Sequence, residues 1–182
     1  PARQALRRDG AKPGDDIWVS GTLGDAALAV AAKNKRIKLK PAELKQALQR
    51  LDRPQPRIAL GVALRGIARS AIDVSDGLVA DLMHIAVASG VAMDIDPTAL
   101  VVGEPVAAAA AAFNADPLVW ILTGGEDHAV VATFPAGTTL PEGFIAFSTV
   151  VEPADVPALS GPGVTVAGRV PLGAAGHDHF AG

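Results

Sequence analysis

The sequence predicts an α/β fold, formed as a single domain in which helices lie in layers against a β-sheet. Short β-prone segments alternate with longer helical ones along the chain, which is typical of layered α/β domains. The 182 residues are 49% apolar and 19% charged, which is enough apolar surface to form a substantial core. Because no internal repeat divides the chain, we expect one domain over residues 1–182.

The chain up to residue 95 is expected to form three strands and four helices. Short apolar or alternating segments predict strands at residues 17–20, 71–74 and 91–95. Apolar spacing and composition predict helices at residues 23–33, 41–51, 57–68 and 77–89. Pro41 favours a helix start, because the first helical position needs no N–H donor. Gly90 is expected to end the fourth helix.

The rest of the chain is expected to add a helix and three strands. Alanines favour a helix at residues 104–113, and apolar segments predict strands at residues 129–134, 144–151 and 164–170. Residues 118–122 fit either a strand or a helix, because periodicity does not decide in so short an apolar run. Proline and glycine predict a loop at residues 152–163, and a glycine-rich tail follows at residues 173–182.

Composition argues against several classes of function. The formal net charge of −3 gives no reason to expect nucleic acid or an anionic membrane as a partner. The absence of cysteine excludes disulfides and thiolate metal sites and fits a cytoplasmic location. The longest apolar run, residues 106–113, is too short to cross a bilayer, and no signal peptide is recognisable. The chain does not begin with Met, which suggests a piece of a longer protein.

The stretch A-I-D-V-S-D-G-L places two carboxylates and a hydroxyl at a strand-to-helix corner. Asp73 ends the expected strand, and Ser75 and Asp76 precede the expected helix. Ligands of α/β sheets usually bind at such strand ends, and a helix N-terminus offers N–H groups to an anion. Two carboxylates this close repel each other unless a cation such as Mg²⁺ lies between them. The alternative is that Ser75 or Asp76 merely caps the helix.

Two further stretches combine charged residues with glycine. In T-G-G-E-D-H the glycines would let a ligand approach the backbone, and Glu126 and Asp127 follow; the alternative is a turn with solvated acids. In R-R-D-G-A-K-P-G-D-D, Arg8 and Lys12 are candidates for contact with phosphate, whereas K-P-G-D is also an ordinary β-turn signal.

The tail contains G-H-D-H-F, in which two histidines suggest a metal pair. We do not predict a catalytic zinc site there, because such a site needs three protein ligands and no third is evident.

Together and in this order, these strings resemble the C-terminal half of bacterial thiamine-monophosphate kinases. The matching strings are R-x-G-A-K-P-G-D, V-S-G-T-L-G-D-A-A, R-P-x-P-R, I-D-V-S-D-G-L, D-L-x-H-I-A-x-A-S-G-V, G-G-E-D and G-x-D-H-F. The resemblance covers essentially the whole chain. D-V-S-D-G-L with G-G-E-D is its most specific part, because related aminoimidazole ribonucleotide and selenophosphate synthetases carry other strings there.

The resemblance implies a fold and an activity. The implied fold is a layered α/β/α domain with a mixed sheet and partial ferredoxin-like topology, as in the C-terminal domain of PurM. The implied activity is transfer of the γ-phosphoryl group of ATP to thiamine monophosphate, giving thiamine diphosphate, with several Mg²⁺ ions. Residues 1–182 would be the C-terminal domain, inactive alone, and the absent N-terminal domain would bind further Mg²⁺ and form a homodimer.

The resemblance also implies roles for individual residues. Asp73 and Asp76 would hold Mg²⁺, whereas Arg8 and Ser75 would contact ATP. Glu126 would contact the thiamine substrate. No residue is expected to act as a covalent catalyst, because direct phosphoryl transfer needs positioning and charge neutralisation instead.

An aromatic residue of the tail string would pack on the substrate. His177 occupies its usual position here, and Phe180 is the fallback. The sequence also departs from the family after G-G-E-D, where His128, Ala129 and Val130 replace the usual Tyr-Glu-Leu.

Two other functions remain open on the sequence. One is a non-catalytic nucleotide-binding module that kept these corners but lost the chemistry, which the His177 departure favours slightly. The other is a related enzyme acting on a different phosphate substrate, with a formyl or selenium group.

Overall fold

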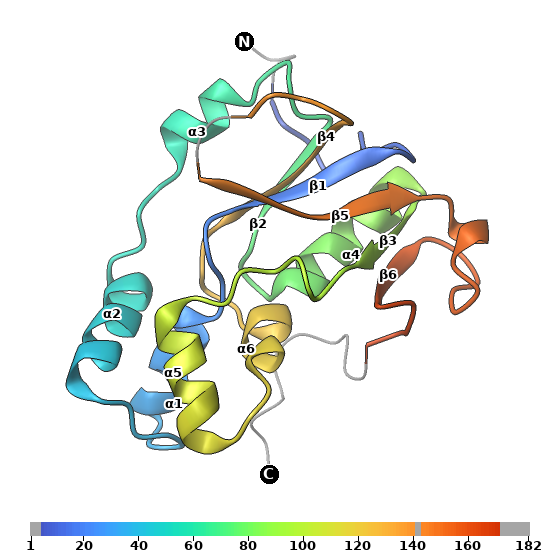
Figure 1. The fold of residues 1–182 in the computed structure, drawn as a ribbon. Helices are drawn as coiled ribbons and strands as arrows, with labels where there is room; N and C mark the ends of the chain where they lie inside the picture. Colours follow the sequence, from blue (N-terminus) through green and yellow to red (C-terminus); the bar gives the residue numbers. More distant parts are fainter. Residues whose placement is uncertain (1–4, 141–142, 172–182) are drawn as a thin grey trace.

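A six-stranded mixed sheet forms the centre of the computed structural model, which describes residues 5–140 and 143–171 (Figure 1). Its strands are β1 (Asp15–Ser20), β2 (Ser70–Asp73), β3 (Ala92–Ile95), β4 (Val130–Pro135), β5 (Phe144–Val151) and β6 (Gly163–Val166). Their order is β2-β4-β1-β5-β3-β6, and among these strands only β3 and β6 pair in parallel. Because β4 is antiparallel to both β1 and β2, the last residues of β1 and β2 and the first residues of β4 lie at the same end of the sheet.

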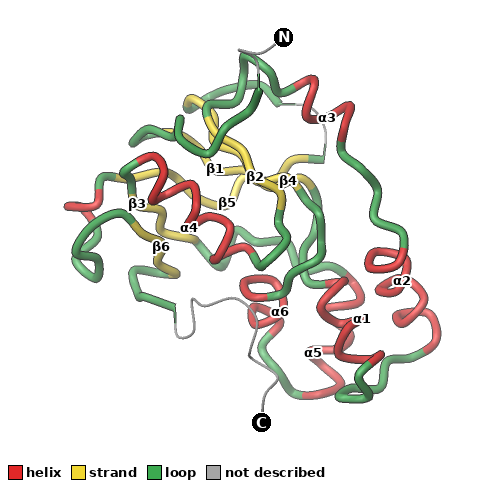
Figure 2. The backbone as a smooth tube through the Cα atoms, turned by 180° about the vertical axis from the view of Figure 1, so that it is seen from behind, coloured by secondary structure: helices red, strands yellow, loops and turns green. Residues whose placement is uncertain are grey.

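One helix lies along a face of the sheet, and most of the others gather at one end of it (Figure 2). The helices are α1 (Asp25–Lys33), α2 (Pro41–Asp52), α3 (Ile58–Ala63), α4 (Leu78–Ser89), α5 (Glu104–Phe113) and α6 (Pro117–Thr123). Helix α4 lies against one face, where Leu82 and Ile85 join the main core with Ile17 of β1. The opposite face carries a smaller cluster in which Leu64, just after α3, packs with Phe134. The predicted α/β class and layered arrangement are confirmed.

Most predicted elements form where the sequence places them. Helix α2 begins at Pro41, and α4 ends at Gly90, whose φ of 71° is left-handed. The undecided segment is helix α6, which starts at Pro117 and is capped by Asp116, because this carboxylate accepts the Leu118 N–H at 2.9 Å. None of the helices within residues 5–140 and 143–171 is long and apolar enough to cross a membrane.

Two elements are shorter than predicted. The helix expected over residues 57–68 is only α3, because the chain turns after Ala63 and Gly66 adopts a positive φ of 76°. The last strand ends at Val166 rather than residue 170, because Ala167 and Gly168 turn with φ of 49° and 74°. Local backbone turns thus overrule an apolar pattern at both places.

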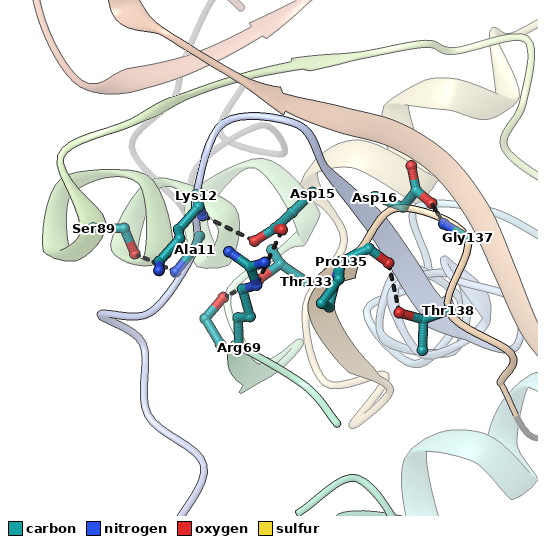
Figure 3. A network of polar contacts seen from close by, with 11 residues as sticks. Ala11, Lys12, Asp15, Asp16, Arg69, Ser89, Thr133, Pro135, Gly137 and Thr138 are labelled. Atoms are coloured by element: carbon teal, nitrogen blue, oxygen red, sulfur yellow. Dashed lines mark hydrogen bonds and ion pairs between the residues drawn. The ribbon is translucent and has the colours of Figure 1, made fainter. Parts of the chain in front are cut away.

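The K-P-G-D stretch forms the β-turn that its sequence predicts (Figure 3). The Asp15 N–H donates to the Lys12 carbonyl at 3.0 Å, and the Lys12 N–H donates to the Asp15 carboxylate at 2.9 Å. This buried carboxylate also pairs with Arg69, which precedes β2, at 3.3 Å. Next to this turn, the Ala71 N–H of β2 donates to the Arg7 carbonyl at 2.8 Å. The turn thus fixes the N-terminal segment beside the outer edge of the sheet.

Candidate phosphate and metal site

The two acidic strings of the sequence meet where β2 ends and β4 begins. The Val74 N–H donates to the Ala129 carbonyl at 2.7 Å, and the His128 N–H donates to the Val74 carbonyl at 3.0 Å. The Glu126 N–H then donates to the Ser75 carbonyl at 2.9 Å. These bonds extend the antiparallel pairing of β2 and β4 into both loops. Residues 74–77 and 123–129 therefore form one unit, although about fifty residues of chain separate them.

The paired glycines of the second string have a structural partner. A Cβ at Gly125 would lie 2.3 Å from the Ser75 carbonyl oxygen, and one at Gly124 would lie 2.3 Å from the Trp120 carbonyl oxygen. Both distances are impossible for a real side chain, so these positions require glycine. The sequence interpretation, that the glycines admit a ligand, is corrected here, because the neighbouring backbone already fills the space.

The loop before α4 is held by a carboxylate from inside the helix. Asp81 is 2% exposed, and its Oδ2 accepts the N–H groups of Ser75, Asp76 and Gly77 at 2.9, 3.0 and 3.2 Å. Helix α4 begins after Gly77 and has no side-chain cap from that position. The alternative in which Ser75 or Asp76 caps the helix is therefore wrong, and these two side chains are left for other contacts.

A compact group of possible metal ligands lies on the first turns of α4. One ligand atom each from Asp76, Asp81 and His84 lies within 4.8 Å of the others. Burial raises the pKa of Asp81 above its ordinary value, backbone hydrogen bonds oppose this shift, and the charge of Asp76 adds to it. Two carboxylates that repel each other and offer hard oxygen ligands suit Mg²⁺. The two carboxylates fit the predicted ion, whereas the imidazole of His84 is not a ligand that Mg²⁺ prefers, and the predicted ligand Asp73 is not one of the three residues of this group.

Asp127 faces the interior and joins the G-G-E-D string to helix α1. Its carboxylate accepts the Gly24 N–H at 2.6 Å and the Ala26 N–H at 3.2 Å, at the N-terminus of α1. Only 3% of the residue is exposed, and burial raises its pKa to about 6, although the two N–H groups and Arg50 act to lower it. Asp127 is thus a structural anchor rather than one of the solvated acids of a turn.

Glu126 points away from the interior, beside Asp127. Its side chain is 56% exposed and lies 3.5 Å from the imidazole Nε2 of His128. Both residues adopt positive φ, 66° and 50°, which is uncommon for residues with a side chain and marks a strained turn. The strained backbone directs Glu126 outward while Asp127 stays buried, which leaves Glu126 available to a ligand.

Of the other predicted residues, Asp73 and Ser75 lie close to the N-terminus of α4, whereas Arg8 lies near its C-terminus. Asp73 is exposed at the end of β2, in register with Val130, and Ser75 lies in the shared loop. Arg8 is exposed, and its carbonyl accepts the Ser89 hydroxyl at 2.9 Å, at the C-terminal end of α4. The backbone of Arg8 therefore lies at the end of α4 opposite to Asp76.

His177 and Phe180 lie outside the described residues, as does the whole histidine-containing tail. Their predicted contact with the substrate stays a prediction.

Asp81, His84 and Asp127 belong to the site but received no role from the sequence. Asp81 could have been found as an acidic residue in the first turn of a helix, where it complements free N–H groups. The string G-G-E-D drew attention to Asp127, but no local signal indicates its buried structural role, because its partners at α1 are about a hundred residues away.

Curated proteins of the family that the strings resemble are similar to this chain. A thiamine-monophosphate kinase of Salmonella typhimurium is 44% identical over 136 residues, which are 74% of this chain and 41% of that protein. One from Mycobacterium tuberculosis is 43% identical over 141 residues, with the same coverage of both chains. This chain is homologous to the C-terminal part of the thiamine-monophosphate kinases. The matched residues make up only 41% of the length of each of these curated relatives. No family model matches the chain.

Solved structures of thiamine-monophosphate kinases share the fold. The enzyme of Aquifex aeolicus superposes with a TM-score of 0.79 at 30% identity, over 91% of this chain and 54% of that one. AaThiL complexed with AMPPCP and TMP gives a TM-score of 0.82 at 31% identity, over 96% and 54% of the two chains. The Escherichia coli hydrogenase maturation protein HypE, at 19% identity and a TM-score of 0.63 over 89% of this chain and 49% of that one, shares the fold alone.

Proposed function

We propose that residues 1–182 are the C-terminal domain of a kinase that transfers the γ-phosphoryl group of ATP to thiamine monophosphate. One observation carries the proposal: the loop 74–77 and the G-G-E-D string are hydrogen-bonded into one unit at the N-terminus of α4. The two ligands of the AaThiL complex, AMPPCP and TMP, support the choice of substrates. The TMP in that complex favours this substrate over the different phosphate substrates that the sequence left open.

Different residues of the shared unit would bind the metal ion, ATP and the thiamine substrate. The exposed Asp73 and Asp76 would hold Mg²⁺, with Asp81 completing the oxygen ligands around Asp76. Bound Mg²⁺ would neutralise charge on the phosphate groups and so lower their mutual repulsion. Ser75 would contact ATP where the helix dipole of α4 favours negative charge. Glu126 would contact the thiamine substrate from the outward turn.

Arg8 would contact ATP farther along the same unit, from its position at the other end of α4. In the whole enzyme, an N-terminal domain would supply further Mg²⁺ ligands and form a homodimer. The cytoplasmic location also stays a prediction.

The decisive test uses the whole gene product that contains this chain. Formation of thiamine diphosphate from ATP and thiamine monophosphate, measured by chromatography with varied Mg²⁺, is expected for the wild type. Asp73→Asn and Asp76→Asn should lower turnover about a hundredfold or more and raise the Mg²⁺ requirement, because each removes a charged ligand. The exposed carboxylate of Asp155, in the short helical turn Pro153–Asp155 after β5, offers a control, because Asp155→Asn should keep wild-type turnover. An inert wild type that still binds ATP would favour the nucleotide-binding module instead.

A further inference from the structure

A polar cavity lies between α2 and the loop that leads into α1. It encloses about 250 Å³, and its lining is polar throughout: Thr22, Asp25, Gln46, Gln49, Arg50, Arg53 and Gln55. Helices α1 and α2 lie side by side at the end of the molecule that is away from the strands β3 and β6 (Figure 1). None of these lining residues belongs to the loops 74–77 and 123–129. Asp127 of the second loop binds the N–H groups on either side of Asp25, but its side chain does not line the cavity, and the inference does not depend on the proposed function.

Positive charge is concentrated around this cavity. Arg50 and Arg53 line it, and a Cβ at Gly21 would lie 3.8 Å from a terminal nitrogen of Arg50 and 3.6 Å from one of Arg57. Burial and the charge of Arg50 both lower the pKa of Arg57, which shows that the two guanidinium groups repel each other. An anion in the cavity would relieve this repulsion.

Two buried polar atoms beside the cavity have no partner in the described part of the chain. They are Oδ1 of Asp25, a residue that is 6% exposed, and Nε of Arg50. Arg50 donates instead to the Thr22 carbonyl at 2.9 Å through a terminal nitrogen. Buried acceptors and donors without hydrogen-bond partners are rare and costly, so these two atoms are positions at which a ligand in the cavity could form hydrogen bonds. A ligand that satisfies both atoms accepts a hydrogen bond from arginine and donates one to a carboxylate.

We propose that this cavity binds a small oxyanion that carries its own acidic proton, as inorganic hydrogen phosphate does at neutral pH and as a phosphate monoester does in its singly ionised form. Its unprotonated oxygens would accept from Arg50 and Arg53, and its P–OH group would donate to Oδ1 of Asp25. Neutral amides of the three glutamines complete a lining that suits a compact polar ligand. Sulfate has the same shape but no proton at neutral pH, so it would leave Asp25 without a donor and place two negative charges in contact.

The experiment is a calorimetric titration of the 182-residue chain at neutral pH without Mg²⁺. Inorganic phosphate, glycerol phosphate and sulfate are compared at the same ionic strength. We expect at least one phosphate compound to bind about tenfold or more tightly than sulfate, because a site that needs a donor rejects an analogue lacking one. The two phosphate arms show which source fits. Equal affinity for sulfate, or binding of neither phosphate compound, would overturn the proposal.

Two variants locate the binding. Arg53→Gln alters an exposed residue of the cavity and is expected to weaken phosphate about tenfold, whereas Arg65→Gln removes an equally exposed arginine elsewhere and should change nothing. Asp25→Asn should abolish the preference for phosphate over sulfate, because the amide donates where the carboxylate only accepts. Equal losses in both arginine variants would overturn the proposal. Amide NMR shifts confined to residues 22–25 and 46–53 would support it even if Asp25→Asn fails to fold.

Discussion

Asp81 and Asp127 are both buried carboxylates that accept backbone N–H groups, but they organise the site over very different ranges. Asp81 binds three N–H groups of the loop immediately before its own helix. Asp127 binds two N–H groups at the start of α1, across about a hundred residues of chain. The first bond set shapes a loop, whereas the second ties two parts of the core together. Substitution of Asp81 is therefore expected to affect mainly ligand binding at the site, and substitution of Asp127 mainly the stability of the fold.

The largest effect should come from Asp127→Ala. This change leaves the Gly24 and Ala26 N–H groups buried without an acceptor, which should lower the free energy of unfolding by about 3 kcal/mol. Asp127→Asn keeps one acceptor oxygen and should lose about half as much. Urea denaturation followed by circular dichroism measures both values. A loss below about 0.5 kcal/mol for the alanine variant would show that Asp127 is no anchor.

The pH dependence of stability tests the same carboxylate without disrupting it. Burial raises the pKa of Asp127 from 3.8 to about 6, so the folded state holds a proton that the unfolded state has lost. This contribution to stability is present below pH 3.8 and disappears as the pH rises to about 6. The free energy of unfolding of the wild type, relative to Asp127→Asn, should fall by up to about 3 kcal/mol over this range. A flat difference between the two proteins would contradict the assignment.

Asp81→Asn should have a smaller effect on the fold and a strong one on the site. Weaker bonds to the three loop N–H groups should cost about 1–2 kcal/mol of unfolding free energy. Asp76→Asn is the matched comparison, because Asp76 is exposed, and its stability should change by less than about 0.5 kcal/mol. Both variants should weaken Mg²⁺ binding in calorimetry. Loss of stability in Asp76→Asn alone would reverse the roles of the two residues.

The smallest effect on stability is expected for Glu126→Ala, because this side chain is 56% exposed. If the proposed function holds, its loss should raise the KM for thiamine monophosphate more than the KM for ATP. Steady-state kinetics of the whole gene product, with each substrate varied in turn, measures the two constants. The opposite pattern would move Glu126 from the substrate side of the site to the nucleotide side.

Much of the fold follows from local sequence, because its signals act within a few residues. Pro41 and Gly90 mark helix ends that the structure confirms, and alanines place α5 over Glu104–Phe113. The segment at α6 was ambiguous because its apolar run is short; the Asp116 cap before Pro117 was the deciding signal. The strand expected to reach residue 170 fails because a left-handed turn at Ala167 ends it.

The site was less predictable because its geometry depends on pairing between distant segments. Asp73, Ser75 and Asp76 were identified from one corner, and Glu126 from another, but no local pattern shows that Ser75 and Glu126 share a hydrogen bond. The glycines of the second string were misinterpreted for the same reason, since the atoms that exclude a side chain there come from another part of the chain.

The bond between the Ala71 N–H and the Arg7 carbonyl bears on how this protein behaves at high concentration. Strand β2 is an edge strand of the sheet, and an uncovered edge strand can pair with a strand of a second molecule. The segment around Arg7 covers this edge. Trimming the first ten residues should therefore promote aggregation through intermolecular strand pairing, even where the core is left intact.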